Sequence, residues 1–448
     1  MNAPPSQGLT SGLVRLLKRP IDARDRARAA LHVLDWLGCA AAGLTTPPGV
    51  TALAWARTLP TGRCHTVGGL RLSGRDAAFL NGSVGNVLEM DDFYRTALVH
   101  PGPIVVPTAL AAAEETDAGP DALLDAIVRG FEAMIRIGRS VGPTHYKFFH
   151  NTATCGVFGA AAAAGALYRL ADERLVDGLG NAGTQASGLW QCRLEDSMTK
   201  QLHNGRAAQS GLLAAQLAVH GFTGPKLILD GPLGFYNAMC PDGWPDRLLA
   251  EPEAPWLIHG TSFKPWPACR HTHPTIDAAL AARATVDFAA IRRIVVETYR
   301  DALAVCDNPS PMTAVEAKFS LQHASAVVLL RGTPTLADFD VPATRDPEIA
   351  ALRSKVELRE RAPYTVAYPA HFAASLHVEL ADGRTITRDI PDALGDPENP
   401  LPDAMLCDKA RALLNAGGYS PDAAEAVIAA ALALSSGGTV DGLMRLVR

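Results

Sequence analysis

Arg293-Ile294-Val295-Val296-Glu297-Thr298-Tyr299 marks a change of pattern within a chain of 448 residues. The β-branched side chains of this stretch are typical of a strand. Further along, residues 376–380 and 384–390 flank Ala381-Asp382-Gly383, a hairpin signal in which the glycine supplies the positive φ. Between these stretches, residues 314–330 have the pattern of a helix. This part of the chain therefore predicts a small α+β unit.

On both sides of this unit the sequence reads as a succession of helices. Apolar residues recur at helical spacing over 24–42, and Gly43 follows the last of them. Residues 152–170 consist mainly of small and apolar side chains, which predicts a helix buried on all sides. The helical pattern returns from Asp403 onward. We therefore predict a mainly α fold, with a large helical domain formed by both chain ends, residues 1–263 and 396–448, and a smaller inserted α+β domain, residues 264–395.

The composition is that of a globular protein with a substantial core. Hydrophobic residues make up 48% of the chain, charged residues make up 19%, and the formal net charge is −5. A nucleic-acid-binding protein would show a basic excess, so no nucleic-acid partner is expected. The eight cysteines include no Cys-x-x-Cys pair, and the sequence shows neither a signal-peptide pattern nor an apolar run of membrane-spanning length. These features predict a reduced, soluble, cytoplasmic protein with no membrane partner.

A cluster of reactive side chains lies at Lys264-Pro265-Trp266-Pro267-Ala268-Cys269-Arg270-His271-Thr272-His273-Pro274, where the two predicted domains meet in the sequence. Its prolines favour a stiff loop over a regular helix. Cations, imidazoles and a thiol in one loop suit an enzyme that binds an anion and moves protons. The position of the loop between two predicted domains also fits, because ligand clefts commonly form there. The alternative is a solvated surface loop. The candidate residues here are Lys264, Cys269, His271 and His273.

An acidic cluster lies nearer the start of the chain. Glu89, Asp91 and Asp92 fall within four residues, and His100 follows. Carboxylates this close repel one another, and burying more than one of them raises at least one pKa. Folds avoid that cost unless cations or a proton-transfer role offset it. The alternative is a helix end with its carboxylates in solvent.

Two further clusters adjoin predicted helices. His150 stands directly ahead of the helix predicted over 152–170, where the helix dipole disfavours the imidazolium form. A neutral ring at that place is able to act as a base or a hydrogen-bond donor. In the other cluster, Lys200 and His203 share one helical face and Arg206 follows; a lysine and an arginine suit two carboxylates of one ligand. The alternatives are a histidine that only caps its helix and an ordinary basic helix start.

In their order along the chain, these motifs resemble the MmgE/PrpD family of 2-methylcitrate dehydratases, which also contains cis-aconitate decarboxylases and iminodisuccinate epimerases. The resemblance covers most of the chain. It implies a large helical domain with a smaller α+β lid domain, an active site in the crevice, a homodimer, and no metal or organic cofactor. The matching stretches are residues 35–43, 81–82, 88–92, 100–101, 150–160, 200–211, 221–225, 264–277 and 318–320.

Three residues depart from the family pattern to which the chain is otherwise similar. Glu89 replaces the first aspartate of the acidic run, and Asn86 stands where a histidine is often seen. Cys269 stands where the decarboxylases of the family have a histidine. This last change argues against decarboxylation of cis-aconitate and leaves His271 or His273 as stand-ins for the missing imidazole.

The expected function is a cofactor-independent hydro-lyase of the 2-methylcitrate dehydratase type, which removes the proton next to a carboxylate of a small di- or tricarboxylate. His100 and His150 are expected to be the acid and the base, with Asp92 orienting or charging one of them. The expected catalytic residues are Asp92, His100, His150, Lys200 and Lys264, and the expected substrate-binding residues are Glu89, Asp91, His203, Arg206, Cys269, His271 and His273.

Other functions suit the same residues. The alternatives are an epimerase of an iminodisuccinate-like dicarboxylate, a decarboxylase of a cis-aconitate-like acid, and a non-catalytic protein that binds organic acids. A metalloenzyme is not expected, because the sequence contains no His-Glu-x-x-His motif and no Cys/His pair at zinc-site spacing.

Overall fold

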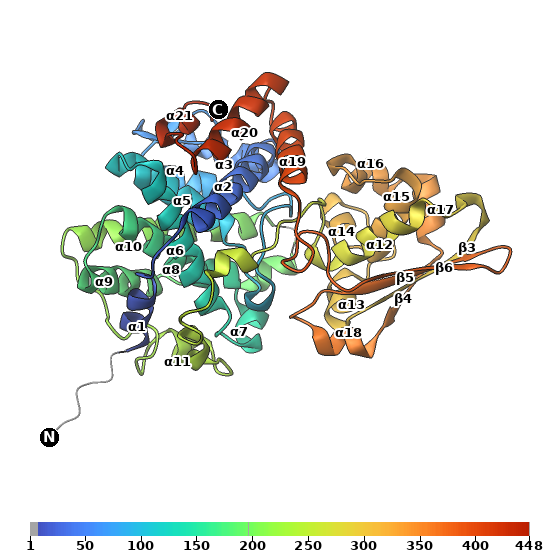
Figure 1. Cartoon of the computed structure of the whole chain (residues 1–448), viewed down its shortest axis with the longest axis horizontal. Helices are drawn as coiled ribbons and strands as arrows, with labels where there is room; N and C mark the ends of the chain where they lie inside the picture. The colour runs from blue at the N-terminus through green and yellow to red at the C-terminus, as the bar shows by residue number, and fades with distance from the viewer. Residues whose placement is uncertain (1–7, 196, 448) are drawn as a thin grey trace. The chain divides into compact units, whose positions relative to one another are not determined.

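The computed structural model describes residues 8–195 and 197–447, and the chain divides into two compact units (Figure 1). Unit 1 is built from helices and unit 2 combines helices with a sheet, which confirms the predicted mainly α fold with a small α+β part. Unit 1 draws on both ends of the chain. Within the described residues, unit 1 contains 8–87, 91–261 and 403–447, and unit 2 contains 88–90 and 262–402.

Unit 1 is a helical assembly with one short antiparallel pair, β1 (Cys64–His65) and β2 (Arg71–Leu72). No helix in the described part of the chain has both the length and the apolar character needed to cross a membrane. The α-helices of unit 1 are α1 (Leu9–Leu16), α2 (Ala23–Leu44), α3 (Pro47–Ala56), α4 (Gly74–Val84), α5 (Gly102–Thr116), α6 (Pro120–Gly138), α7 (Pro143–Phe148), α8 (Asn151–Leu167), α9 (Asp172–Gly183), α10 (Thr199–Val219), α11 (Phe235–Met239), α19 (Asp403–Ala416), α20 (Pro421–Ala433) and α21 (Val440–Met444). Short 3-10 turns in this unit are η1 (Arg95–Ala97), η2 (Trp190–Arg193), η3 (Pro245–Leu248) and η4 (Leu257–Gly260).

Helix α8 runs through the core of unit 1. It packs against α5, α6, α9 and α10, and its residues other than Ala166 are buried, as its composition predicts. The small side chains allow neighbouring backbones to come close: a Cβ at Gly159 would lie only 2.8 Å from the carbonyl oxygen of Gly130 in α6. The core therefore fixes the start of α8, which is where His150 lies.

The two ends of the chain meet in unit 1 through α2 and α19, which pack against each other. Helix α2 begins with a capping box, in which the Asp22 side chain accepts from backbone N–H groups and Asp25 reaches back to the Asp22 N–H. Farther along α2, Asp35 forms an ion pair with Lys409 of α19 at 2.5 Å, and both side chains are buried. A buried pair of this kind holds the two helices in one register.

Unit 2 is built on a four-stranded sheet in the order β4-β3-β5-β6. Strands β3 (Ile291–Thr298) and β4 (Val356–Glu360) are parallel, whereas β5 (Ala374–Leu380) pairs antiparallel with both β3 and β6 (Thr385–Ile390). The helix α12 packs against β5 and β6. The helices are α12 (His273–Arg283), α13 (Arg300–Cys306), α14 (Ala314–Lys318), α15 (Leu321–Arg331), α16 (Val341–Thr344), α17 (Pro347–Arg353) and α18 (Ala362–Ala367), with 3-10 turns η5 (Arg270–Thr272), η6 (Phe288–Ala290) and η7 (Leu336–Phe339).

The local predictions for unit 2 are confirmed. The strand expected over 293–299 is β3, and the predicted hairpin joins β5 to β6 with Gly383 at φ 86°. The helical pattern over 314–330 corresponds to two helices, α14 and α15. Ser320 separates them: its side chain accepts from the N–H of His323 and caps the second helix.

Candidate active site

The side chains of His100 and Asp91 are in contact in unit 1. Nδ1 of His100 lies 2.8 Å from Oδ2 of Asp91, a carboxylate that is 1% exposed. The other carboxylate oxygen accepts a hydrogen bond of 2.7 Å from Nδ2 of Asn86, and the main-chain N–H of His100 donates to Oγ1 of Thr152 at 3.1 Å. We infer from this contact that Nδ1 carries the proton, so that in the neutral ring Nε2 holds the lone pair. His100 is thereby prepared to accept a proton at Nε2.

His150 occupies the N-cap position of α8 and is buried. Its main-chain N–H donates to the carbonyl oxygen of Gly188 at 2.8 Å, and its ring lies 4.3 Å from that of Trp190 between centroids. Burial is the main cause that holds the pKa of His150 well below its usual value, and the positive charge of Lys200 lowers that pKa further. Nδ1 of His150 makes no hydrogen bond with any described group. His150 is therefore a neutral imidazole near pH 7 with one ring nitrogen unused by the fold.

Helix α10 contributes Lys200 and His203, which lie about one turn apart. The His203 ring lies 5.5 Å from the His150 ring between centroids. Burial is again the larger cause that lowers the pKa of His203, followed by the charge of Lys200. Gly188 lies beside this pair with a φ of +133°, a conformation that residues with a Cβ rarely adopt.

Arg206 lies on the same helix but contacts other groups. Its guanidinium is exposed, donates to Oε1 of Gln209 at 2.5 Å, and lines a cavity of about 280 Å³ with Arg75 and Asp76. Within the part of the chain that the structure describes, Arg206 makes no hydrogen bond or ion pair with His150. The prediction that Lys200 and Arg206 bind two carboxylates of one ligand therefore rests only on their position in the same helix.

Asp92 and His32 form a second buried pair. His32 Nδ1 lies 2.6 Å from Oδ2 of Asp92, and the other carboxylate oxygen accepts from the N–H of Gly102 at the start of α5 at 2.8 Å. Burial raises the pKa of Asp92 to about 7 and holds the pKa of His32 well below its usual value. Both shifts oppose charge, so we infer that the pair holds one proton and no net charge below about pH 7.

The role expected for Asp92, to orient or charge one of the two histidines, stays a prediction, and the charge of His100 acts on Asp92. The Asp92 side chain contacts His32, and the contact with His100 belongs to Asp91. Sequence reasoning missed His32, which lies within the apolar pattern of α2 and carries no motif of its own.

Unit 2 holds a second group of the predicted residues. Nζ of Lys264 lies 3.6 Å from Oε2 of Glu89, and the lysine side chain is 1% exposed. Glu89 has a φ of 58°, a left-handed conformation that is costly for a residue with a Cβ. Nζ of Lys318 donates to the carbonyl oxygen of Leu88 at 3.3 Å. These contacts hold the short segment 88–90 in unit 2.

The two histidines considered as stand-ins have different surroundings. His273 is fully buried: Nδ1 accepts from Nη1 of Arg270 at 3.1 Å, and Nε2 donates to the carbonyl oxygen of Ala268 at 3.2 Å. Both of its ring nitrogens are used inside the unit, so the fold leaves His273 none for a substrate. His271 is half-buried, with Nδ1 2.6 Å from the hydroxyl of Tyr299. Of the two, only His271 keeps the imidazole near the domain surface.

Cys269 is a buried thiol next to the Lys264–Glu89 pair. Its main-chain N–H donates to the carbonyl oxygen of Lys318 at 2.9 Å. A hydrogen bond from Cys306 is the main cause that holds the pKa of Cys269 below its usual value. The charge of Lys264 also lowers this pKa, whereas burial raises it. The thiol is thus placed among ionisable groups of unit 2.

Five of the predicted residues gather in unit 1, namely Asp91, His100, His150, Lys200 and His203. The other four all act on the charge state of His150, which places them in one electrostatic cluster. The cluster combines an imidazole that is held by a carboxylate with a neutral imidazole beside a lysine. Pairs of titratable groups in such different surroundings are typical of acid–base sites.

Comparisons with known proteins place the chain in a family. The MmgE/PrpD N-terminal domain matches residues 15–247, and the MmgE/PrpD C-terminal domain matches residues 266–434. The chain is similar to cis-aconitate decarboxylase of Homo sapiens, with 30% identity over 403 residues, 86% of this chain and 82% of that protein. Cis-aconitate decarboxylase of Aspergillus terreus is 28% identical over 428 residues, 88% of this chain and 85% of that protein.

A dehydratase is similar over a shorter stretch. The 2-methylcitrate dehydratase of Cupriavidus necator is 29% identical over 202 residues, 42% of this chain and 41% of that protein. Two family domains that together span most of the sequence, and the near full-length similarity to the human protein, show that this chain belongs to the MmgE/PrpD family.

Proposed function

We propose that this protein is a hydro-lyase that uses its own side chains to remove a proton next to a carboxylate of a small di- or tricarboxylic acid, of the 2-methylcitrate type. The observation that carries the proposal is the cluster in unit 1, where His100 is held by Asp91 and neutral His150 lies beside Lys200. Its family membership supports an enzyme of this broad kind, since the relatives include decarboxylases and a dehydratase.

His100 is the proposed base. Its Nε2 accepts the proton from the carbon next to the carboxylate, and the ring then becomes an imidazolium. Asp91 stabilises that charge from 2.8 Å and is itself oriented by Asn86. A general base that is oriented in this way contributes about 10²–10⁴-fold to a rate.

His150 and Lys200 are the proposed partners on the side of the leaving group. As the carbon–oxygen bond breaks, the neutral ring of His150 gives its N–H proton to the departing hydroxide, which leaves as water. The imidazolate that remains on His150 regains a proton from solvent, and the His100 imidazolium loses one, which closes the cycle. The charge of Lys200 disfavours the imidazolium, and for the same reason it favours loss of a proton from the neutral ring. Lys200 also supplies a cation for a substrate carboxylate.

The test is product analysis by NMR. The purified protein is incubated with 2-methylcitrate, citrate and related hydroxy acids, and alkene proton signals are followed with time. We expect an alkene product from one of these acids, and its formation is expected to be lost in His100→Asn. An absence of alkene from all of them, in a folded and monodisperse sample, would contradict the hydro-lyase assignment.

Decarboxylation of a cis-aconitate-like acid is the second candidate. It is favoured by the similarity to cis-aconitate decarboxylases over more than four fifths of the chain, whereas the similarity to the dehydratase covers 42%. In that reaction carbon dioxide leaves and a carbon atom gains a proton, so the same imidazoles serve as proton donors. Loss of a labelled carboxylate from cis-aconitate, with no reaction of hydroxy acids, would favour this candidate over the first.

A further inference from the structure

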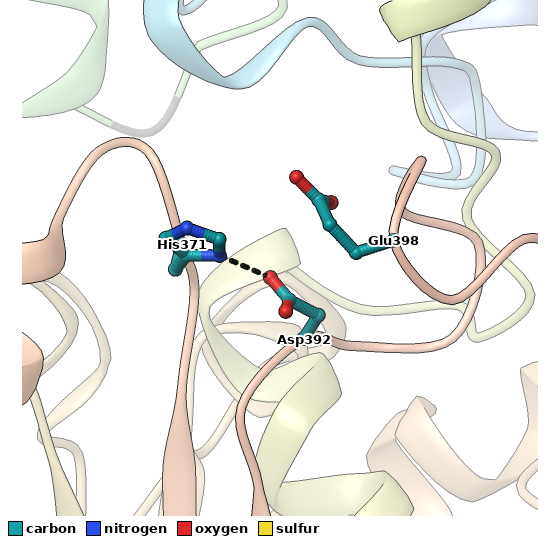
Figure 2. A group of neighbouring side chains, drawn as sticks. All are labelled: His371, Asp392 and Glu398. Atoms are coloured by element: carbon teal, nitrogen blue, oxygen red, sulfur yellow. Dashed lines mark hydrogen bonds and ion pairs between the residues drawn. The ribbon is translucent and has the colours of Figure 1, made fainter.

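We infer that unit 2 binds a divalent transition-metal ion through His371, Asp392 and Glu398 (Figure 2). Each of the three side chains offers one ligand atom, and these atoms lie within 4.8 Å of one another. One imidazole nitrogen with two carboxylate oxygens is a donor set that suits Zn²⁺ or Co²⁺. Ca²⁺ and Mg²⁺ prefer oxygen ligands alone. This metal site uses none of the residues proposed for proton transfer.

The β5–β6 hairpin brings two of the three ligands together. Ala374, the first residue of β5, lies opposite Ile390, the last residue of β6. His371 precedes β5 by three residues and Asp392 follows β6 by two, so both belong to the open end of the hairpin. Nδ1 of His371 accordingly lies 2.7 Å from Oδ1 of Asp392. The sheet register therefore builds this half of the site.

A closed turn after β6 supplies the third ligand. Nδ2 of Asn399 donates to the carbonyl oxygen of Asp392 at 3.2 Å, which brings the neighbouring Glu398 back toward the hairpin. The turn is anchored inside the unit, because Asp396 is fully buried and forms an ion pair with Arg270 at 2.5 Å. Figure 2 shows the side chains of His371, Asp392 and Glu398 around a common space. The backbone of the site is thus fixed without any ion.

The spacing of the ligand atoms is close to what an ion needs. Two ligands that share an ion lie at most about 4.2 Å apart, since each bond is about 2.1 Å long. The cluster, whose ligand atoms lie within 4.8 Å of one another, therefore has to contract by less than an ångström. His371 and Glu398 are exposed side chains at the ends of this cluster, so rotation of either ring or carboxylate provides the movement.

Titration of the full-length protein with Co²⁺ tests the site. The protein is first treated with a chelator, dialysed and checked for residual metal, and Co²⁺ absorbance bands are then followed, with Zn²⁺ added in competition. His371→Ala and Glu398→Gln remove one ligand each. The matched controls are His220→Ala and Glu253→Gln, which change an exposed histidine and an exposed glutamate of unit 1.

We expect one Co²⁺ per chain in the wild-type protein and in both controls. Because loss of a residue that only supports a ligand weakens metal binding by about 10–100-fold, loss of a ligand is expected to weaken it by at least about tenfold. Failure of the wild-type protein to bind a stoichiometric ion would overturn the proposal. So would binding by His371→Ala and Glu398→Gln that equals that of the wild-type protein.

Discussion

Asp91 and Asp92 are neighbours in the sequence but serve different partners. Asp91 lies against His100 and is oriented by Asn86, whereas Asp92 lies against His32 and the N–H of Gly102. The first arrangement prepares an imidazole for proton transfer. The second buries a carboxyl group whose pKa is raised to about 7 by its surroundings. One acidic cluster therefore supplies both a part of the proposed chemistry and a part of the core.

The first prediction at this scale concerns His150. We expect His150→Ala to lower kcat by about 10²–10⁴-fold, because the variant loses a proposed proton donor. Steady-state kinetics on the acid identified by NMR provide the measurement, with circular dichroism as the check of folding. The exposed His220→Ala is the matched control. A folded His150→Ala protein with unchanged kcat would remove His150 from the mechanism.

A second prediction concerns the Asp92–His32 pair and pH. Unfolded aspartate and histidine titrate near pH about 3.9 and about 6.5, so between these values the unfolded pair holds one proton. The folded pair also holds one proton, so it adds no pH dependence to the stability of the wild-type protein in that range. In Asp92→Asn, the folded His32 is neutral while the unfolded His32 binds a proton. The variant therefore loses about 1.4 kcal/mol of stability relative to wild type for each pH unit below about 6.5.

The measurement for this second prediction is denaturant unfolding of wild type and Asp92→Asn from pH 5 to pH 7. The difference between their free energies of unfolding is the quantity to plot, because the contributions of other groups cancel in it. A difference that stays constant over this range would show that the buried pair does not share one proton.

A third prediction concerns Lys264 in unit 2. If Lys264 binds a substrate carboxylate, Lys264→Met raises KM by about tenfold or more, since hydrogen bonds to charged groups contribute about 1.5–3 kcal/mol. The substitution also removes the cation from Glu89 at 3.6 Å. Adding Glu89→Gln to the same chain relieves that unpaired charge. A KM that returns to the wild-type value in the double variant would assign Lys264 a structural role only.

Much of the candidate site was predictable from residue types, but the contacts were not. His150 and Lys200 stand out because they adjoin or lie on predicted helices, and His100 stands out because it follows an acidic cluster. The neutral state of His150 was predicted from the helix dipole, whereas the structure gives burial as the main cause. Burial of one side chain depends on the packing of distant segments, and a single sequence does not report it.

Among the secondary-structure elements, α8 connects packing to chemistry. It begins with His150 at its N-cap, and it crosses α6 at Gly159 and Gly130 with almost no space between the backbones. The Ala- and Gly-rich composition of residues 152–170 predicts such a helix. The composition does not identify the partner helix, because small residues fit against any neighbour.

A prediction at the scale of the element follows from this crossing. We expect Gly159→Ala to lower the free energy of unfolding by about 1–3 kcal/mol, as overpacked cores do. The added Cβ would lie 2.8 Å from the carbonyl oxygen of Gly130, so a backbone has to move. Gly178→Ala in α9 is the matched control, since its Cβ would have no neighbour nearer than 3.6 Å. Equal melting temperatures for the two variants would contradict this account of the α6–α8 contact.

The division of residues 314–330 into α14 and α15 is a detail that the helical pattern does not report. Apolar residues recur through the whole stretch. Helix α14 ends at Lys318 with Phe319 as its C-cap, and the side chain of Ser320 caps the start of α15 by accepting a hydrogen bond from the N–H of His323. A serine within a helical pattern is compatible with one helix or with two, and the fold around it decides between them.

For the whole molecule, the order of motifs was more informative than any one of them. The change from helical to extended pattern near residue 290 predicted a helical domain with an α+β part, and the structure confirms that fold class. The order of the clusters predicted the MmgE/PrpD family, and the two matching domains confirm it. The choice among family reactions remained open because every candidate reaction needs proton transfer next to a carboxylate.

The metal site proposed in unit 2, by contrast, could not be predicted from sequence motifs. His371 and Asp392 are 21 residues apart, so no short motif joins them. The pairing of β5 and β6 brings them together, but both residues lie outside the predicted strands, residues 376–380 and 384–390. Sequence motifs alone therefore predicted no metal ion for this chain.

The most direct test of the central claim is proton NMR in D₂O of the wild-type protein and His100→Asn, each with the same panel of di- and tricarboxylic acids. For one acid we expect loss of the proton signal next to a carboxylate together with a new alkene signal in the wild-type sample. In His100→Asn we expect both changes to slow by about 10²-fold or more. A folded wild-type protein that neither exchanges a proton nor forms a product with any of these acids would contradict the proposed proton-transfer function.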